Sequence, residues 1–154
     1  MILFRNRFIP FDSFAHLTWL FIIFERDEED VWLSDRSRRH ETIHAYQQCE
    51  LCLLSLLLMC VFGFVYGFSW WVWLLWGFGS LFVGWLLYLV FWVLEILLPP
   101  YTYAYKDICF ETEAYAFEDD VDYLRRRIPF WGWIRCIFDR DLIALGRGYR
   151  RRRD

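Results

Sequence analysis

The sequence predicts a mainly α-helical membrane protein whose central element is a two-helix transmembrane hairpin. Hydrophobic residues make up 58% of the 154 residues and aromatic residues 23%, whereas an ordinary soluble domain has roughly 45–50% apolar residues. They are concentrated in one block, because the 44 residues from Leu51 to Leu94 include no Asp, Glu, Lys, Arg or His. One crossing of a bilayer needs about 20 such residues. We therefore expect two membrane helices within a single domain of residues 1–154.

Basic residues flank this block on both sides. Six of the 17 Lys and Arg residues precede it and eleven follow it. Short segments rich in Lys and Arg stay in the cytoplasm, and a hairpin returns the chain to the side from which it left. Both termini are therefore expected on the cytoplasmic side of an inner or cytoplasmic membrane. The five Cys residues suggest no disulfide framework on that side.

Residues 14–34 are predicted to form a β-hairpin in front of the block. The run from Phe14 to Phe24 is aromatic and β-branched, and it is too short for a membrane helix. It also lacks the small-residue cleavage site of a signal peptide. A charged turn at residues 27–29 is expected to lead to a second short strand at residues 31–33.

The two membrane helices are expected at residues 38–66 and 70–98. Ser37 is a suitable N-cap for the first helix, which has no Gly or Pro before Gly63 and so can run from the cytoplasm into the bilayer. Small residues on the second helix should let the two helices approach closely; they are Gly77, Gly79 and Gly84.

The residues that carry chemistry are concentrated in one pentapeptide, His40-Glu41-Thr42-Ile43-His44. The two His residues are four positions apart, so on a helix both imidazoles project from one face and can bind one Zn²⁺. Glu41 is placed to act as a base toward a water molecule. This is the HExxH pattern, in a chain that has only three His residues. The alternative interpretation is a polar helix end just outside the membrane.

A catalytic zinc site needs a third protein ligand, and a cytoplasmic helix over residues 107–127 is expected to supply it. This segment follows the hairpin and contains no Gly or Pro. Helical spacing places Glu111, Tyr115 and Glu118 on one face, whereas Glu113 points to another face, beside solvent. Taken alone, an acidic helix is usually a solvated surface; behind an HExxH helix it becomes a candidate for the third ligand.

The order of these motifs resembles that of integral-membrane gluzincin metalloproteases, which include the HtpX-like heat-shock proteases and the prenyl-protein endoproteases. The first motif matches in full. Residues 111–115 match the second motif, Glu-x-x-Ala-Asp, except that Tyr115 stands in place of the Asp. The chain is also similar to small bacterial membrane proteins in which Gln-Gln follows HExxH, as Gln47 and Gln48 do here.

This resemblance implies a membrane-embedded zinc metallopeptidase that hydrolyses peptide bonds of a peptide or membrane-protein substrate at the cytoplasmic membrane face. His40, His44 and Glu111 would bind Zn²⁺ in a zincin-like site, and Glu41 would be the catalytic base. Supporting residues or alternative ligands are Glu113, Tyr115 and Glu118. An exposed strand within residues 14–24 is expected to hold an extended substrate by strand addition.

Two other interpretations remain. Tyr115 in place of Asp favours a catalytically inactive zinc-binding membrane scaffold, and the apolar block could also form a holin-like hairpin. Residues 128–154 are predicted to form an interfacial aromatic segment and a basic tail. The tail, with Arg150–Arg153, is expected to bind anionic lipids of the bilayer, and no nucleic-acid partner is expected.

Overall fold

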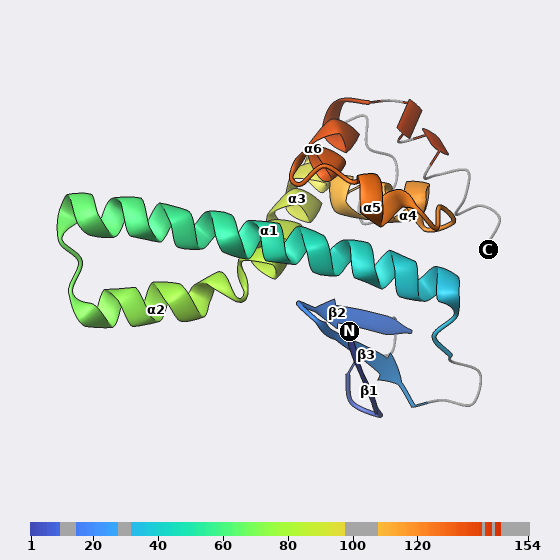
Figure 1. Cartoon of the computed structure of the whole chain (residues 1–154), viewed down its shortest axis with the longest axis horizontal. Coiled ribbons are helices and arrows are strands. Elements are labelled where there is room, and N and C mark those ends of the chain that lie inside the picture. Colours follow the sequence, from blue (N-terminus) through green and yellow to red (C-terminus); the bar gives the residue numbers. More distant parts are fainter. Residues whose placement is uncertain (10–14, 28–31, 98–107, 140, 143, 146–154) are drawn as a thin grey trace.

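The computed structural model describes residues 1–9, 15–27, 32–97, 108–139, 141–142 and 144–145. Its elements are β1 (Ile2–Asn6), β2 (His16–Trp19), β3 (Ile22–Arg26), α1 (Asp35–Tyr66), α2 (Trp70–Ser80), α3 (Val83–Leu97), α4 (Cys109–Phe117), α5 (Tyr123–Arg126) and α6 (Trp131–Phe138). Figure 1 shows that α1 and α2 project as a hairpin, while the sheet and helices α4–α6 gather around the first half of α1. We call this second part the head. The protein is mainly α-helical, with an N-terminal three-stranded sheet.

The sheet has the strand order β1-β3-β2, with β2 and β3 antiparallel and β1 parallel to β3. A β-hairpin is therefore present within residues 14–34, but its turn lies at Leu20 and Phe21. The predicted turn at residues 27–29 is wrong for this hairpin. Of the predicted second strand at residues 31–33, the two described positions, 32 and 33, form no strand. β1 was not predicted at all.

The turn at Leu20 contains no Gly, Asn or Pro, so the usual sequence signals of a turn are missing. Leu20 adopts a left-handed conformation with a φ of 51°, which is uncommon for a residue other than glycine. Its backbone N–H donates to Gln48 Oε1 at 2.7 Å, and Gln48 Nε2 donates to the Thr18 carbonyl at 2.9 Å. A side chain of α1 thus holds the backbone on both sides of Trp19.

Helix α1 begins at Asp35, three residues before the predicted start, and ends at Tyr66 as predicted. Ser34 is the N-cap, because its Oγ accepts a hydrogen bond from the Ser37 N–H at 3.0 Å. The predicted cap, Ser37, is therefore the donor instead. The first half of α1 packs between the sheet and α4 (Figure 1), which places the HExxH motif in the middle of the head.

The returning segment is broken into α2 and α3, which are bent by 59°. The prediction of one helix over residues 70–98 is therefore wrong at Leu81 and Phe82; residue 98 lies outside the described residues. Trp19 of β2 contacts both residues between α2 and α3. Its Nε1 donates to the Leu81 carbonyl at 3.1 Å, and its ring stacks on that of Phe82 with centroids 5.4 Å apart.

Close approach of the helices occurs at one of the three predicted glycines. A Cβ at Gly84 would lie 2.9 Å from Cγ of Gln48, so glycine lets α3 lie this close to α1. Within the described part of the chain, a Cβ at Gly77 or Gly79 would meet nothing within 4 Å. The prediction is wrong for these two positions.

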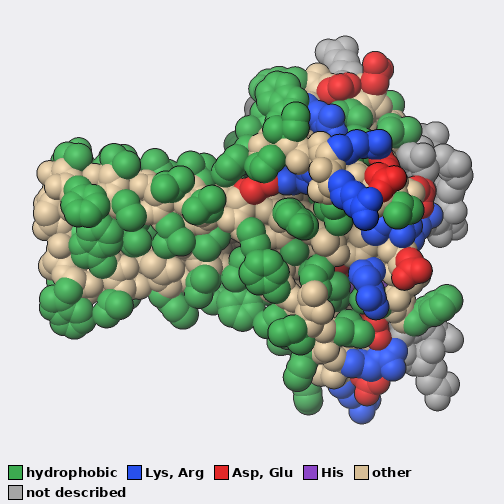
Figure 2. All heavy atoms as spheres, in the orientation of Figure 1, with side chains coloured by type: hydrophobic (Ala, Val, Ile, Leu, Met, Phe, Trp, Pro, Cys, Tyr) green, Lys and Arg blue, Asp and Glu red, His purple; other side chains and the backbone are tan. Residues whose placement is uncertain are grey.

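Two segments are candidates for membrane spans. By length and composition α1 can cross a membrane, and the bent pair of α2 and the first part of α3 is a second candidate if it counts as one span. On the face drawn in Figure 2, the projecting hairpin carries hydrophobic side chains, and the charged side chains lie on the head.

Residues 107–127 form two helices instead of the predicted one, and residue 107 lies outside the described residues. α4 ends at Phe117, and a turn separates it from α5. Oδ1 of Asp120 accepts a hydrogen bond from the Asp122 N–H at 3.1 Å in this turn, a common role of Asp. The chain folds back, so that the rings of Phe117 and Tyr123 stack with centroids 4.0 Å apart.

An apolar cluster joins α6 to α3, α4 and α1. Its buried members are Leu51, Ile108, Cys109, Phe110 and Cys136. α6 lies within the predicted interfacial segment of residues 128–154, whereas Arg150–Arg153 lie outside the described residues. The cluster fixes α4, and with it the segment that was expected to supply the third ligand.

Candidate metal centre

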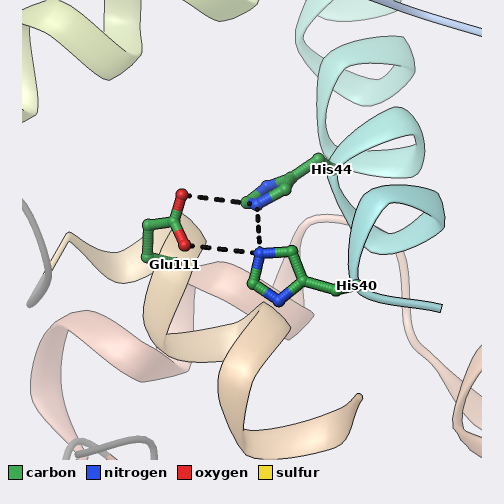
Figure 3. Close-up of side chains that lie close together, drawn as sticks. All are labelled: His40, His44 and Glu111. Carbon is green, nitrogen blue, oxygen red and sulfur yellow. Dashed lines mark hydrogen bonds and ion pairs between the residues drawn. The ribbon is translucent and has the colours of Figure 1, made fainter. Parts of the chain in front are cut away.

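Helices α1 and α4 bring three side chains to one point. His40 and His44 lie one turn apart on α1, and Glu111 lies in the first turn of α4 (Figure 3). Glu111 Oε2 is 3.5 Å from His40 Nε2, and Glu111 Oε1 is 3.4 Å from His44 Nε2. The two Nε2 atoms are 3.1 Å apart. The side chains of His40, His44 and Glu111 are 8%, 13% and 11% exposed. We call these three residues the His–His–Glu group.

The three side chains are close enough together to share one metal ion. Imidazole nitrogens and carboxylate oxygens bind zinc at about 2.0–2.2 Å, so the corners of such a tetrahedron lie about 3.3–3.6 Å apart. The Nε2–Nε2 distance of 3.1 Å and the N–O distances of 3.4 and 3.5 Å, which end on different oxygens of Glu111, are close to that range. With one ligand atom from each residue, the three atoms lie within 4.8 Å of one another. The His–His–Glu group can therefore hold a metal ion through two nitrogens and one oxygen, which leaves a fourth corner for another ligand.

A carboxylate outside the group fixes the His40 imidazole. Glu118 is fully buried, and its Oε2 lies 2.9 Å from His40 Nδ1. An ionised carboxylate only accepts hydrogen bonds, so Nδ1 carries the proton and Nε2 presents its lone pair to Glu111. Arg36 Nε donates to Glu118 Oε1 at 2.8 Å, and Arg39 Nε donates to the Glu118 carbonyl at 2.6 Å. Both contacts keep Glu118 in place.

An amide performs the same task for His44. Gln47 Oε1 lies 2.9 Å from His44 Nδ1. Gln47 Nε2 donates to the Phe110 carbonyl at 3.0 Å and to Glu113 Oε2 at 2.8 Å, which directs the amide oxygen toward His44. His44 therefore also donates through Nδ1 and presents Nε2 to Glu111.

The three converging atoms are all acceptors when both imidazoles are neutral, so positive charge is needed between them. Burial alone would lower the pKa of His40, but hydrogen bonds to Glu111 and Glu118 and the charges of Glu111 and Glu41 raise it to about 10. Burial would likewise raise the pKa of Glu111, but His44 and His40 hold it well below its usual range. A divalent cation meets the same need while the imidazoles stay neutral.

Glu41 lies beside the group and is anchored from the sheet. Thr18 Oγ1 on β2 donates to Glu41 Oε2 at 2.8 Å, and both residues are buried. Burial lowers the pKa of His40 and His44, while the charge of Glu41, added to that of Glu111, raises it. A buried carboxylate this close to the His–His–Glu group is suited to accept a proton from water.

The outer edge of β2 is covered near this carboxylate. The Thr18 carbonyl accepts hydrogen bonds from Gln48 Nε2 at 2.9 Å and from Trp85 Nε1 at 3.3 Å, and the Leu20 N–H is bound to Gln48. Side chains of α1 and α3 thus occupy the backbone groups that strand addition needs. The predicted exposed strand for an extended substrate is therefore wrong at Thr18 and Leu20.

Helix α3 also contacts the His–His–Glu group. The Tyr88 hydroxyl on α3 donates to Glu111 Oε1 at 2.9 Å. A pocket of about 30 Å³ adjoins this contact and is lined by His44, Gln48, Trp85 and other residues of α1, α3 and α4. It has room for one or two water molecules. The metal centre thus opens toward the junction of α1 and α3.

The remaining predicted residues have different positions. Tyr115 packs its ring edge-on against His40, with centroids 4.7 Å apart. Glu118, three residues further on the same face, supplies the carboxylate that the resemblance places at position 115. Glu113 points away from the His–His–Glu group as predicted, but it is fully buried and not beside solvent. Gln47, Thr18 and Tyr88 were not predicted as site residues.

A second buried cluster, which no sequence pattern indicated, lies behind His44. Arg127 is 3% exposed and lies between two carboxylates: its Nε is 2.6 Å from Glu113 Oε1, and its Nη1 contacts Glu50 Oε1. The Tyr123 hydroxyl also donates to Glu113 Oε1 at 2.6 Å. A Cβ at Gly132 would collide with that oxygen, so glycine leaves room for the cluster. In the sequence, Glu50 directly precedes the charge-free block and Arg127 follows it at a distance. Nothing in the sequence indicates that these two residues pair.

Comparison with models of protein families, with curated proteins and with solved structures finds no match to this chain. The functional argument therefore depends on the geometry of the His–His–Glu group and on the residues that orient it.

Proposed function

We propose that this protein is a membrane-embedded zinc metallopeptidase that hydrolyses peptide bonds at the cytoplasmic membrane face. One observation carries the proposal: His40, His44 and Glu111 converge at separations of 3.1–3.5 Å beside the buried carboxylate of Glu41. The motif order supports the same class through its resemblance to integral-membrane gluzincin proteases. Two imidazoles and one carboxylate, with a fourth position open, are a usual ligand set of catalytic zinc.

The chemistry follows from the roles of the individual side chains. A zinc ion held by this group would act as a Lewis acid toward a peptide carbonyl and would lower the pKa of water to about 7. Glu41 accepts the proton of the attacking water and then donates it to the leaving amine. Thr18 keeps the Glu41 carboxylate in position. Glu118 and Gln47 hold the imidazoles with Nε2 free and increase their basicity.

The membrane placement is supported by the exposed apolar surface of the hairpin and by the basic residues on both sides of it. In this arrangement the bilayer surrounds α2 and the part of α1 that follows Leu51, and both termini are cytoplasmic. The substrate is a peptide or a segment of a membrane protein that reaches the membrane surface. Arg150–Arg153 contact anionic lipids.

Metal content tests the site before any substrate is known. The purified protein should contain about one zinc per chain, and Glu111→Ala should bind zinc roughly 100-fold or more weakly, because loss of outer contacts alone costs 10–100-fold. Asp122→Ala is the matched control, since this acid is 68% exposed. Glu113→Ala should weaken zinc binding less than Glu111→Ala does, because Glu113 reaches His44 only through Gln47. Zinc that is retained in Glu111→Ala and lost in Glu113→Ala would place the site on the other face of α4.

Hydrolysis separates the enzyme from an inactive scaffold, which is favoured by the small size of the pocket beside His44, about 30 Å³. Glu41→Gln should keep its zinc and lose peptide hydrolysis by about 10²–10⁴-fold, the usual contribution of a general base. If neither zinc-loaded wild type nor Glu41→Gln cleaves any member of a peptide library, the scaffold interpretation is correct; equal cleavage by both would show that Glu41 is not the base. A holin-like pore is not favoured, because Ser55 and Ser80 bond to each other at 2.8 Å between α1 and α2.

A further inference from the structure

A second pocket lies between α5 and α6 and shares no residue with the His–His–Glu group. Its volume is about 150 Å³, enough for several water molecules and therefore for a phosphate group. Three of its lining residues are arginines, and none is acidic; the arginines are Arg126, Arg127 and Arg135. Figure 2 shows Lys or Arg side chains gathered beside hydrophobic ones on this part of the head.

The three guanidinium groups differ in whether they form ion pairs with carboxylates. Arg127 is bound by Glu50 and Glu113, and Arg126 is paired with Asp120. Arg135 forms no ion pair with the described residues.

Arg135 has a hydrogen-bond donor that no described residue accepts. Its guanidinium lies 4.8 Å from the centroid of the Phe117 ring, and its Nη2 donates to the Tyr123 hydroxyl at 3.4 Å. Its Nε is buried and has no hydrogen-bond partner among the described residues. A buried donor without an acceptor is costly, and a guanidinium presents its donors in the geometry that phosphate oxygens accept. The site therefore suits an anion with several acceptor oxygens.

The rim of the pocket indicates which phosphate compound would bind. Ile128 and Trp131 line it and are 63% and 55% exposed, and Trp is enriched where membrane and water meet. Trp133, on the opposite side of α6, donates to Glu50 at 3.1 Å. Glu50 immediately precedes the charge-free block, so α6 lies at the level where the hairpin leaves the head.

We propose that this pocket binds the phosphate of an anionic phospholipid headgroup. Arg135 and Arg126 bind the phosphate oxygens, while Ile128 and Trp131 contact the glycerol and the upper acyl chains. This site depends on the proposed membrane placement of the hairpin but not on metal or on peptide hydrolysis.

Binding can be measured on the full chain in an uncharged detergent, from the rise in melting temperature with added dihexanoyl phosphatidylglycerol. Arg135→Gln should weaken this binding at least tenfold, because charge-assisted hydrogen bonds are lost. Arg125→Gln is the matched control: this neighbouring arginine is 87% exposed and does not line the pocket. Its affinity should stay within about twofold of wild type.

Three results would overturn the proposal. Equal weakening by Arg125→Gln and Arg135→Gln would show diffuse attraction in place of a pocket. Equal affinity for inorganic phosphate and for phosphatidylglycerol would assign the pocket to free phosphate. Full binding in Arg126→Gln would contradict the site even if Arg135→Gln does not fold, because Arg126 is 66% exposed and its replacement should be tolerated by the fold.

Discussion

The two halves of α1 differ in which kinds of side chain they bury and which they expose. The first half, in the head, buries polar and charged side chains; they are His40, Glu41, Gln47 and Glu50. The second half, in the hairpin, leaves large apolar side chains exposed; they are Leu53, Leu54, Leu57, Leu58, Val61, Phe62, Phe64 and Val65. After Leu51, Gly63 is the next buried residue of the helix.

This difference fits the proposed membrane placement of the hairpin. Polar groups are rarely buried unless each has a partner, and in the head Glu50, Glu118 and Glu41 each have one. Exposed apolar side chains in such a number are unfavourable in water and neutral in lipid. The head is therefore organised by pairing of charges, whereas the apolar surface of the hairpin suits the lipid surroundings that we propose.

The largest effect is expected at the buried ion cluster. Arg127→Ala leaves Glu50 and Glu113 buried without their cation, which should lower the free energy of unfolding by about 3–5 kcal/mol. Chemical denaturation in detergent measures this change. Arg125→Ala, at an exposed site, should alter stability by less than about 0.5 kcal/mol. If both variants unfold alike, charge pairing does not organise the head.

The next effect concerns the hairpin. Leu58 is 43% exposed in the second half of α1, and Tyr46 is 50% exposed in the first. In water an arginine at either site would be tolerated. In a bilayer Leu58→Arg should cost about 2.5–3.5 kcal/mol of insertion free energy, whereas Tyr46→Arg should cost little. Resistance to alkaline extraction from membranes compares the two; equal extraction would mean that lipid does not surround residue 58.

A smaller effect is expected where α3 contacts the His–His–Glu group. Tyr88→Phe keeps the ring beside Phe110, at 6.4 Å between centroids, but removes the hydroxyl that binds Glu111. Zinc affinity should fall about tenfold, as for other contacts that orient a ligand. Competition with a chelator measures it, with Tyr46→Phe as the control for the same chemical change at an exposed site. Unchanged affinity would confine the metal centre to α1 and α4.

Helical periodicity and the resemblance in motif order together predicted the members of the His–His–Glu group. The two His residues are four positions apart, and the face of Glu111, Tyr115 and Glu118 follows from spacings of four and three. Each of these relations lies within one helix. Periodicity could therefore predict which side chains share a face and place Glu113 on a different one, while the resemblance in motif order indicated that Glu111 lies opposite the two His residues.

The contacts that fix this group come from far along the chain, which is why sequence reasoning missed them. Glu50 and Arg127 are separated by 77 residues, and Thr18 and Glu41 by 23. The positive φ values of Leu20 and Phe130 have no signal in their own residue types. Each is held by an α1 side chain: Gln48 accepts from Leu20 N at 2.7 Å and Glu50 from Phe130 N at 2.9 Å. Such backbone depends on tertiary contacts.

The length of the hairpin has a consequence for the depth of the metal centre. The 16 residues from Leu51 to Tyr66 reach about 24 Å along a helix, whereas the hydrocarbon core of a typical bilayer is about 30 Å thick. In the proposed membrane placement, this difference would be accommodated by local thinning of the bilayer or by sinking of the head into the headgroup layer. Glu50 would not meet lipid as an unpaired charge, because it is paired with Arg127 inside the protein. Membrane thickness would then set how far the metal centre lies from the acyl chains, and so which peptide bonds of a membrane protein come within its reach.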